Sequence, residues 1–549
     1  MTAADLVITG RIATLAGDAG FGWVEAIAIR NGRVIASGTI AEIQPLVAAP
    51  TEQIALAPDE AAMPGMTDAH LHLAEGALSA GRLDLTQSPT LDDALSLVAE
   101  RHAALDPDGW LEGHGWDADR WGGWPRATDL DRAAPGRRVA IWAHDHHSLW
   151  VSDAALRAGG VTAATDDPPG GMIRRADDGA PTGVLLETAS RLVFGAIPRP
   201  SPDELMPAIE ALGRELLAVG VVAAHDPGAL SPQSGLGPAF EAYRRLSDAG
   251  RLPIRVHASV RHEQLAAAID AGIRSGDPIG DANGRARIGW LKLFGDGTLG
   301  SRTAALLEPI EDEPGHPLPP GTERGVFLTT PEQLAELAGR AAGARISCQI
   351  HGIGDAAVRA ALDALAPTAG RTRLSPRIEH VQLVAPDDLG RFAAQHIAAS
   401  VQPVHLRGDA EVARRLWGRR AEAFGYPLAS LVRGGAVVAF GTDAPVESID
   451  PWPGLAMAVT RRDAGWAADV PAFGPAEALT LAEALRAACV APAVLAAEGA
   501  DRGRLVPGHR ADVVVVPRAA LEEPVEPGGP LTTARPRLVL VDGVVAFEA

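Results

Sequence analysis

Residues 64–72 read PGMTDAHLH, an apolar stretch that ends in two histidines spaced two positions apart. On a β-strand the side chains of residues i and i+2 point to the same side, so His70 and His72 can grip one metal ion together. A His-x-His pair alone is weak evidence, because the same spacing is common in ordinary surface and core strands. Its meaning depends on what the rest of the chain places around it.

Outward from this stretch, the chain contains eight apolar, strand-like segments, most of them followed by a helical pattern. This alternation predicts an α/β fold, a TIM (β/α)8 barrel with parallel strands. The predicted strands are Met63–His72, Gly220–Asp226, Ile254–Val260, Ile288–Gly295, Arg345–His351, Arg377–Leu383, Ile397–His405 and Val437–Asp443. The clearest helical patterns cover residues 331–342 and 355–365.

Both ends of the chain consist of short strands with hairpin signals, such as Asn31-Gly32 and Asp542-Gly543. Neither end is large enough to bury a core alone, so we predict one small β-sandwich domain from residues 1–60 and 496–549, with the termini close together. The barrel domain then covers residues 61–495. It includes a long insertion after the first strand, residues 85–210, which we expect over the active site because loops after barrel strands emerge on the catalytic face.

The insertion is rich in tryptophan, with six of the chain's 11. Two interpretations are equally open: the rings form the insertion's own core, or they line the substrate pocket. Under the second interpretation Trp116 and Trp121 are predicted substrate contacts, and the substrate carries an apolar or aromatic group.

The composition excludes several classes of function. A formal net charge of −20 over 549 residues disfavours binding to nucleic acid or to an anionic membrane surface. Two cysteines, Cys348 and Cys489, cannot form a disulfide framework. The sequence shows neither a signal-peptide pattern nor a long apolar run. We therefore expect a cytoplasmic protein whose partner is a small molecule, with a homodimer as the commonest assembly.

The other predicted strands carry polar residues that suit a metal centre. Lys292 lies within the apolar strand WLKLF at 290–294, where a lysine must be paired, deprotonated or modified. As a carbamate it could bridge two metal ions; a salt bridge to Asp296 is the alternative. His351 and His380 lie near the ends of the fifth and sixth strands. Asp443 follows the eighth, where a carboxylate can hold a metal and accept a proton from bound water.

Together these motifs resemble the amidohydrolase superfamily, and within it amidohydrolase family 3, the group that includes N-substituted formamide deformylase. The resemblance covers nearly the whole chain. It rests on PGMTDAHLH at 64–72, LKLFGDGTLGSRTA at 291–304, HGIGDAA at 351–357, IEHVQL at 378–383, SVQPVHL at 400–406, FGTDAPVES at 440–448 and GRLVPGHRADVVVV at 503–516.

The resemblance implies that divalent metal ions, with zinc the first expectation, are held by His70, His72, Lys292, His351, His380 and Asp443. The first two would bind the more buried ion, a carboxylated Lys292 would bridge two ions, and the next two would bind the second. Asp443 would be both ligand and catalytic base. A single ion is the alternative, and the ligand types do not specify the metal.

Within the insertion, the family-like stretches GWDADRWGG at 115–123 and HHSLWVSDAAL at 146–156 make His147 a predicted substrate contact. The neighbouring His114, His144 and His146 are not expected to be ligands, because the set from the barrel is already complete.

The expected activity is hydrolysis of an amide-type, non-peptide C–N bond in a small molecule by attack of metal-bound hydroxide. An N-substituted formamide or another secondary amide fits this expectation. A mononuclear deaminase-like amidohydrolase is the closest alternative. A non-catalytic barrel scaffold is the alternative from another class, but such a protein would be expected to lose ligands, and all six are present.

Overall fold

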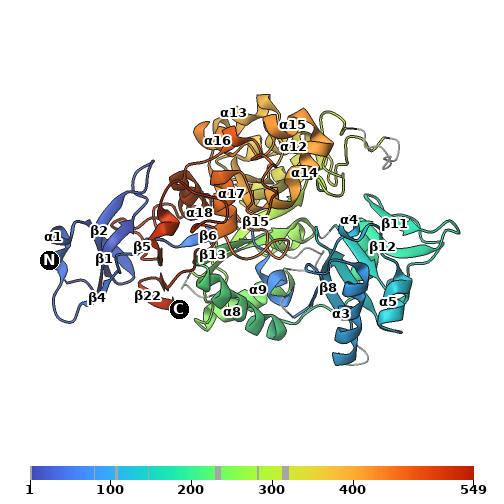
Figure 1. Cartoon of the computed structure of the whole chain (residues 1–549), viewed down its shortest axis with the longest axis horizontal. Coiled ribbons are helices and arrows are strands. Elements are labelled where there is room, and N and C mark those ends of the chain that lie inside the picture. The colour runs from blue at the N-terminus through green and yellow to red at the C-terminus, as the bar shows by residue number, and fades with distance from the viewer. Residues whose placement is uncertain are drawn as a thin grey trace.

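The computed structural model describes residues 3–79, 81–105, 109–145, 147–228, 236–280, 284–311 and 321–549. Three β-sheets organise these residues. Figure 1 shows a sheet built from both chain ends on one side of the molecule, a barrel in the middle and an insertion with its own sheet on the far side. None of the described helices combines the length and the apolar character that a membrane-spanning segment needs.

The central sheet is an eight-stranded parallel barrel in the order β19-β18-β17-β16-β15-β14-β13-β6. Its edges meet where the backbone N–H of Ala69 donates to the carbonyl of Phe440 at 2.9 Å. The predicted fold class is therefore confirmed. The strands are β6 (Met66–Asp68), β13 (Val221–Asp226), β14 (Arg255–Arg261), β15 (Ala286–Phe294), β16 (Cys348–Gly352), β17 (Arg377–His380), β18 (Ala398–Val401) and β19 (Val438–Phe440).

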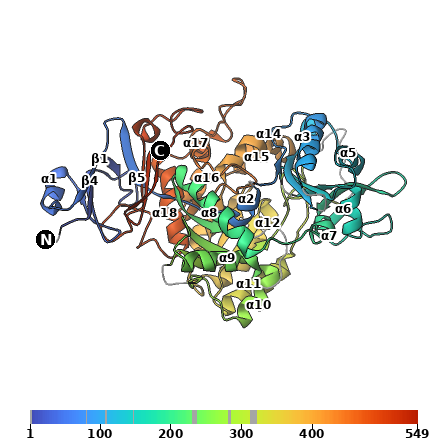
Figure 2. The same ribbon diagram turned by 90° about the horizontal axis from the view of Figure 1, so that it is seen from below.

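Helices surround this barrel, as the view turned by 90° shows (Figure 2). They are α2 (Leu73–Ser79), α8 (Pro202–Ala218), α9 (Gly237–Asp248), α10 (Leu265–Asp270), α11 (Pro331–Gly343), α12 (Asp355–Leu365), α13 (Pro386–Ala394), α14 (Leu406–Trp417), α15 (Arg419–Phe424), α16 (Leu428–Arg433), α17 (Trp452–Thr460) and α18 (Leu481–Leu495). Both helices singled out in the sequence are present. The first, α11, begins at a capping box in which Thr330 and Gln333 bond each other's backbone N–H groups, with Pro331 as the first helical residue.

The first predicted strand, Met63–His72, is divided between two sheets. Its beginning belongs to β5 (Glu60–Pro64) in the terminal sheet, and only β6 belongs to the barrel. The change of sheet occurs at Gly65, whose N–H donates to Asp512, while the next N–H, of Met66, donates to Gly220 beside β13. His70 and His72 therefore follow the strand rather than lie on it.

Both chain ends pair into one sheet, in the order β22-β21-β20-β5-β1-β2-β3, with β4 also paired to β1. The strands are β1 (Leu6–Ala13), β2 (Trp23–Arg30), β3 (Arg33–Gly38), β4 (Glu52–Ala55), β5, β20 (Val513–Pro517), β21 (Leu538–Val541) and β22 (Val544–Glu548). The antiparallel pair of β5 and β20 joins the two ends. Both terminal segments lie in this sheet, and three strands separate β22 from β1.

The insertion forms a six-stranded sheet of its own, in the order β11-β12-β10-β9-β8-β7. Its strands are β7 (Leu83–Asp84), β8 (Leu111–Trp116), β9 (Val139–Ala143), β10 (Ser148–Val151), β11 (Gly171–Arg175) and β12 (Pro181–Glu187), and its helices include α3 (Leu91–Ala104), α5 (Ala127–Ala133), α6 (Asp153–Ala158) and α7 (Arg191–Phe194). It is shorter than the predicted 85–210, because α8 buries Leu205 and Ile209 in the core of the barrel.

Candidate active site

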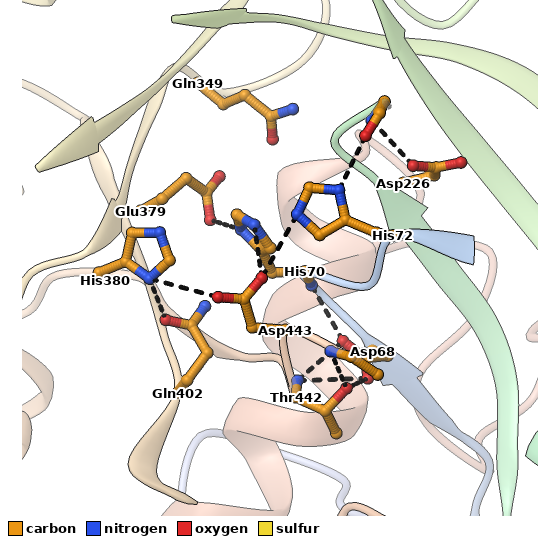
Figure 3. Close-up of polar contacts among 12 residues, drawn as sticks. Asp68, His70, His72, Asp226, Gln349, Glu379, His380, Gln402, Thr442 and Asp443 are labelled. Carbon is orange, nitrogen blue, oxygen red and sulfur yellow. Dashed lines mark hydrogen bonds and ion pairs between the residues drawn. The ribbon is translucent and has the colours of Figure 1, made fainter. Parts of the chain in front are cut away.

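The candidate site is centred on the carboxylate of Asp443, just beyond β19 (Figure 3). Its Oδ1 lies 3.3 Å from His70 Nε2 and 3.4 Å from His72 Nε2, and its Oδ2 lies 3.9 Å from His380 Nδ1. All four residues are buried. The sequence separates these residues by up to about 370 positions, and the closed barrel brings them together.

A close approach between the ends of β6 and β19 places Asp443 beside the histidines. A Cβ atom at Gly441 would lie 2.5 Å from the backbone nitrogen of His70, so only glycine allows this contact. The buried carboxylate of Asp68 ties the same two ends together. It accepts hydrogen bonds from Thr442 Oγ1 at 2.6 Å and from the N–H of His70 at 3.0 Å. Asp68 was not singled out in the sequence.

Two residues of the site have left-handed backbone conformations. The φ angle is +64° at Asp443 and +71° at His380. Such angles are uncommon for residues other than glycine and persist where the surrounding structure imposes them. The strain turns both side chains out of the regular strand direction and towards one another.

In His70 and His72, the ring nitrogen that points away from Asp443 has a hydrogen-bond partner. The Nδ1–H of His70 donates to Glu379 Oε2 at 2.5 Å, and that of His72 donates to the carbonyl of Gly228 at 2.8 Å. Burial by itself raises the pKa of Glu379, but Arg377, 2.7 Å away, and His70 lower it to about 2. Glu379 therefore stays ionised, and the Nε2 lone pairs of His70 and His72 face Asp443.

Lys292 lies on β15 with 1% of its surface exposed. Its Nζ lies 4.8 Å from the ring centroid of Phe294, and among the described residues it makes neither a hydrogen bond nor an ion pair. Burial lowers the pKa of Lys292 to about 8. The alternative partner, Asp296, instead accepts backbone N–H groups of Ala305 at 2.8 Å and Gly354 at 2.9 Å. The salt bridge between Lys292 and Asp296 is thus absent from the part of the chain that the structure describes.

His351 and His380 lie together, with ring centroids 4.4 Å apart. The Nε2–H of His351 donates to the carbonyl of Gly297 at 3.0 Å, so this ring does not reach Asp443. The sequence reasoning missed His405, whose Nε2 lies 3.8 Å from Asp443 Oδ2. His380, His405 and Asp443 form a second group of potential ligands. The signal for His405 was available, because SVQPVHL places it just after the seventh strand.

The insertion reaches the barrel mouth through His147. Its Nδ1–H donates to Glu187 Oε2 at 2.8 Å, and its ring centroid lies 6.4 Å from that of His351. Burial by itself lowers the pKa of His147, but the charge of Glu187 and this hydrogen bond raise it to about 9. Glu187 in turn accepts from Thr303 Oγ1, at 3.0 Å, in the loop after β15. His147 is thus held as a cation beside the predicted ligands.

The two tryptophans predicted to contact substrate lie inside the insertion. Trp116 is 1% exposed and donates its ring N–H to the carbonyl of Ile141 at 2.9 Å. Trp121 packs against the same core and donates to the carbonyl of Ser88 at 3.0 Å. This placement favours the interpretation that the rings form the insertion's own core. A substrate contact by either ring stays a prediction, and the position of His146 lies outside the described residues.

The family model described as "Amidohydrolase family" matches residues 57–547. The chain belongs to the amidohydrolase family. It is accordingly a hydrolase. Among its relatives, Protein LONG AFTER FAR-RED 3 of Arabidopsis thaliana is 31% identical over 95% of this chain and 88% of its own length. N-substituted formamide deformylase of Arthrobacter pascens is 28% identical over 99% and 98%.

A solved structure shares this architecture. The crystal structure of an uncharacterized metal-dependent hydrolase from Pyrococcus horikoshii OT3 superposes with a TM-score of 0.74 and 26% identity, covering 93% of this chain and 97% of its own. The likeness spans the barrel, the terminal sheet and the insertion together, since so little of either chain is left out. The whole three-part arrangement is thus shared with that metal-dependent hydrolase.

Proposed function

We propose that this amidohydrolase uses divalent metal ions to cleave an amide-type, non-peptide C–N bond of a small molecule. The observation that carries the proposal is the convergence of His70, His72 and His380 on the carboxylate of Asp443. The expected ligands are the six predicted from the sequence: His70, His72, Lys292, His351, His380 and Asp443. The structure adds His405 as a candidate beside them.

The residues fit a metal ion in both distance and chemistry. Two ligands at about 2.0–2.1 Å from a tetrahedral ion lie about 3.3 Å from one another. The separations of 3.3 and 3.4 Å between Asp443 Oδ1 and the two Nε2 atoms match this spacing. Because the Nδ1–H groups of His70 and His72 are engaged elsewhere, their lone pairs face a carboxylate oxygen. These lone pairs and the Asp443 oxygen repel one another, and a metal ion bound between them would remove this repulsion.

A divalent ion held by these residues would supply a water activated at neutral pH, because coordination lowers the pKa of water from 15.7 to about 7. Asp443 would accept the proton of that water and deliver it to the leaving nitrogen. Glu379 fixes the ring of His70, and Gly228 fixes that of His72, which keeps their tautomers and directions constant. His147, a cation held by Glu187, would donate a hydrogen bond to the substrate.

Two ions bridged by a carboxylated Lys292 are the form that we propose. A pKa of about 8 leaves about a tenth of the amine neutral at pH 7, far more than for an ordinary lysine, and the neutral amine is the form that adds carbon dioxide. Lys292 has no ion-pair partner among the described residues, which also supports carboxylation. A carbamate would replace this buried cation by an anion that metal ions neutralise. Zinc is the ion proposed, because it accepts imidazole and carboxylate ligands alike.

For the substrate we propose a secondary amide, with N-substituted formamides tested first. The support is the name of the Arthrobacter pascens relative, which matches nearly the full length of this chain. The aromatic pocket expected from the tryptophans does not add support, because those rings fill the insertion's core. The small-molecule substrate as sole partner, the homodimer and the cytoplasmic location stay predictions.

The test is metal content per chain after reconstitution with zinc and bicarbonate, combined with turnover of a panel of formamides and other secondary amides. We expect about two equivalents in the parent. Lys292→Ala should lose at least one of them. The matched Lys292→Glu should recover part of the bound metal, because it restores an anionic oxygen ligand.

Two results would contradict this proposal. One equivalent that Lys292→Ala leaves unchanged would favour the mononuclear deaminase-like alternative. No bound metal after reconstitution, together with no turnover of any amide, would favour the non-catalytic scaffold.

A further inference from the structure

Arg261, the last residue of β14, is buried without the partners that a buried guanidinium normally has. Its side chain is 2% exposed. Neither Nε nor Nη1 has a hydrogen-bond partner within the described ranges. A buried cation without hydrogen bonds is costly, and native structures rarely tolerate one without a ligand or a functional reason. The described carboxylate within ion-pair range, that of Glu263, lies 3.6 Å from Nε and is itself partly exposed.

The guanidinium of Arg261 lies at the mouth of the barrel. Its stem passes Gly228, where an added Cβ atom would lie 3.4 Å from Cγ and 3.5 Å from Cδ. Gly228 is the residue whose carbonyl holds His72. At the other end, the guanidinium carbon lies 4.6 Å from the ring centroid of Phe294, which is 5.6 Å from that of His351. Arg261 is thus flanked on both sides by residues that contact proposed ligands.

Charges of both signs surround Arg261. Lys292 is its register partner on β15. Burial lowers the pKa of Arg261, the charge of Glu263 raises it, and Arg191 of α7 in the insertion lowers it again. Glu75 contributes a weaker opposite effect, and its carboxylate already accepts from Arg82 at 2.8 Å. The nitrogens of this buried guanidinium that lack hydrogen-bond partners call for an anion at this point.

We propose that Arg261 binds a carboxylate of the substrate, so that the amide hydrolysed at Asp443 is one that carries an acidic group. The inference rests on the proposed function for the identity of the reacting bond. A guanidinium matches a carboxylate through two parallel N–H donors, and such pairs are short and strong in a site that excludes water. A carbamate on Lys292 would offer Arg261 the same planar pair of oxygens. The experiment therefore distinguishes a substrate carboxylate from this carbamate as the partner of Arg261.

The experiment measures binding by calorimetry on the metal-loaded protein, at constant ionic strength. The probes are N-methylsuccinamate and N-benzylsuccinamate, two secondary amides that carry a carboxylate, each compared with its methyl ester. We expect the parent to bind at least one acid about tenfold or more tightly than its ester. Arg261→Met should reduce that preference to within about twofold, and Arg261→Lys should keep part of it, because lysine is a cation without the paired donors.

Two controls test whether the effect is specific to Arg261 and independent of the metal ions and the carbamate. Arg244→Met, which removes an exposed arginine paired with Glu241 and Asp248 on α9, should leave the preference unchanged. Metal content and the ¹³C resonance of a carbamate formed from labelled bicarbonate should be the same in Arg261→Met and the parent. Should Arg261→Met fail to fold, the comparison of Arg261→Lys with the parent decides the question.

Three outcomes would overturn the inference. The parent could bind neither acid more tightly than its ester. Arg261→Met could keep the full preference, which would place the carboxylate on the metal ions instead. Arg261→Met could lose the carbamate resonance while binding the probes normally, which would assign Arg261 to Lys292. The readout is binding and does not depend on turnover. A preference for the acid that depends on Arg261, without any hydrolysis, would therefore contradict the proposed function but not this inference.

Discussion

The barrel buries histidines in two groups, and the charges that surround them have opposite signs. At the mouth, His70, His72 and His380 face the carboxylate of Asp443 (Figure 3). The inner histidine pair, His225 on β13 and His257 on β14, is equally buried, with ring centroids 5.2 Å apart. Both groups sit on or beside barrel strands, so a pattern of strand histidines does not distinguish them.

The inner histidine pair lies among guanidinium groups. Arg377 Nη1 donates to His225 Nδ1 at 2.9 Å, and burial and then Arg377 hold the pKa of His225 well below its ordinary value. Burial lowers the pKa of His257 to about 4, against the charge of Glu498. Glu498 is itself bound to Arg502 at 2.5 Å.

A divalent cation would be repelled by the guanidinium groups around the inner pair, whereas Asp443 attracts one at the mouth. From this difference we expect buried histidines to bind a metal ion only where the neighbouring charges are negative.

The largest expected effect comes from removing the negative charge at the mouth. Asp443→Asn keeps the side-chain volume but loses both the ligand charge and the proton acceptor. We expect kcat for the best amide to fall about 10²–10⁴-fold, together with a loss of bound metal. Asp450→Asn, in the same loop, is the control, because its carboxylate pairs with Arg535 instead. Near-normal turnover of Asp443→Asn with metal still bound would contradict the role assigned to Asp443.

A smaller effect is expected at Glu379, which lies between the two groups and contacts both Arg377 and His70. Glu379→Gln keeps an oxygen for the His70 Nδ1–H but removes its charge. We expect about 10–100-fold weaker metal binding, measured by competition with a chelator. The control is Glu498→Gln, which removes the partly buried carboxylate beside the inner pair. Equal metal affinity in the two variants would show that Glu379 does not act through His70.

The same Glu498→Gln variant predicts a pH dependence of stability. Burial by itself raises the pKa of Glu498, but Arg502 and His257 lower it to about 2, below the ordinary 4.5. Because the folded-state pKa is lowered, its contribution is fully present above about pH 4.5 and is lost as the pH falls towards 2. Urea unfolding at several pH values should show the parent more stable by up to about 3 kcal/mol at neutral pH, with the gap closing under acid. A gap independent of pH would count against this assignment.

The smallest expected effect on metal binding comes from the inner pair itself. His257→Asn should leave the number of bound metal ions unchanged, while His70→Asn should reduce it. Elemental analysis of the two purified variants tests the comparison directly. If both variants lost metal equally, the sign of the surrounding charge would not be what separates the two groups of histidines.

The barrel could be predicted from the sequence because its signal is local. Each strand is a short apolar run, and α11 and α12 carry their own periodicity and, in α11, a capping box. The division of the first predicted strand at Gly65 could not be predicted, because it depends on hydrogen bonds to Asp512 and Gly220, far away in the chain. The role of the tryptophans was undecided for the same reason, since burial of Trp116 depends on how the insertion's sheet closes over it.

The sequence by itself determined which side chains are available at the ends of the barrel strands: the imidazoles, the carboxylate of Asp443 and the single amine of Lys292. Residue types and strand periodicity decide that much, because they act over a few neighbouring positions. Only the tertiary structure decided that His405 lies beside Asp443 and that Asp296 accepts hydrogen bonds from backbone N–H groups. It also decided that two guanidinium nitrogens of Arg261 lack hydrogen-bond partners at the mouth. Distances and charge surroundings depend on contacts between distant segments, which local patterns do not contain.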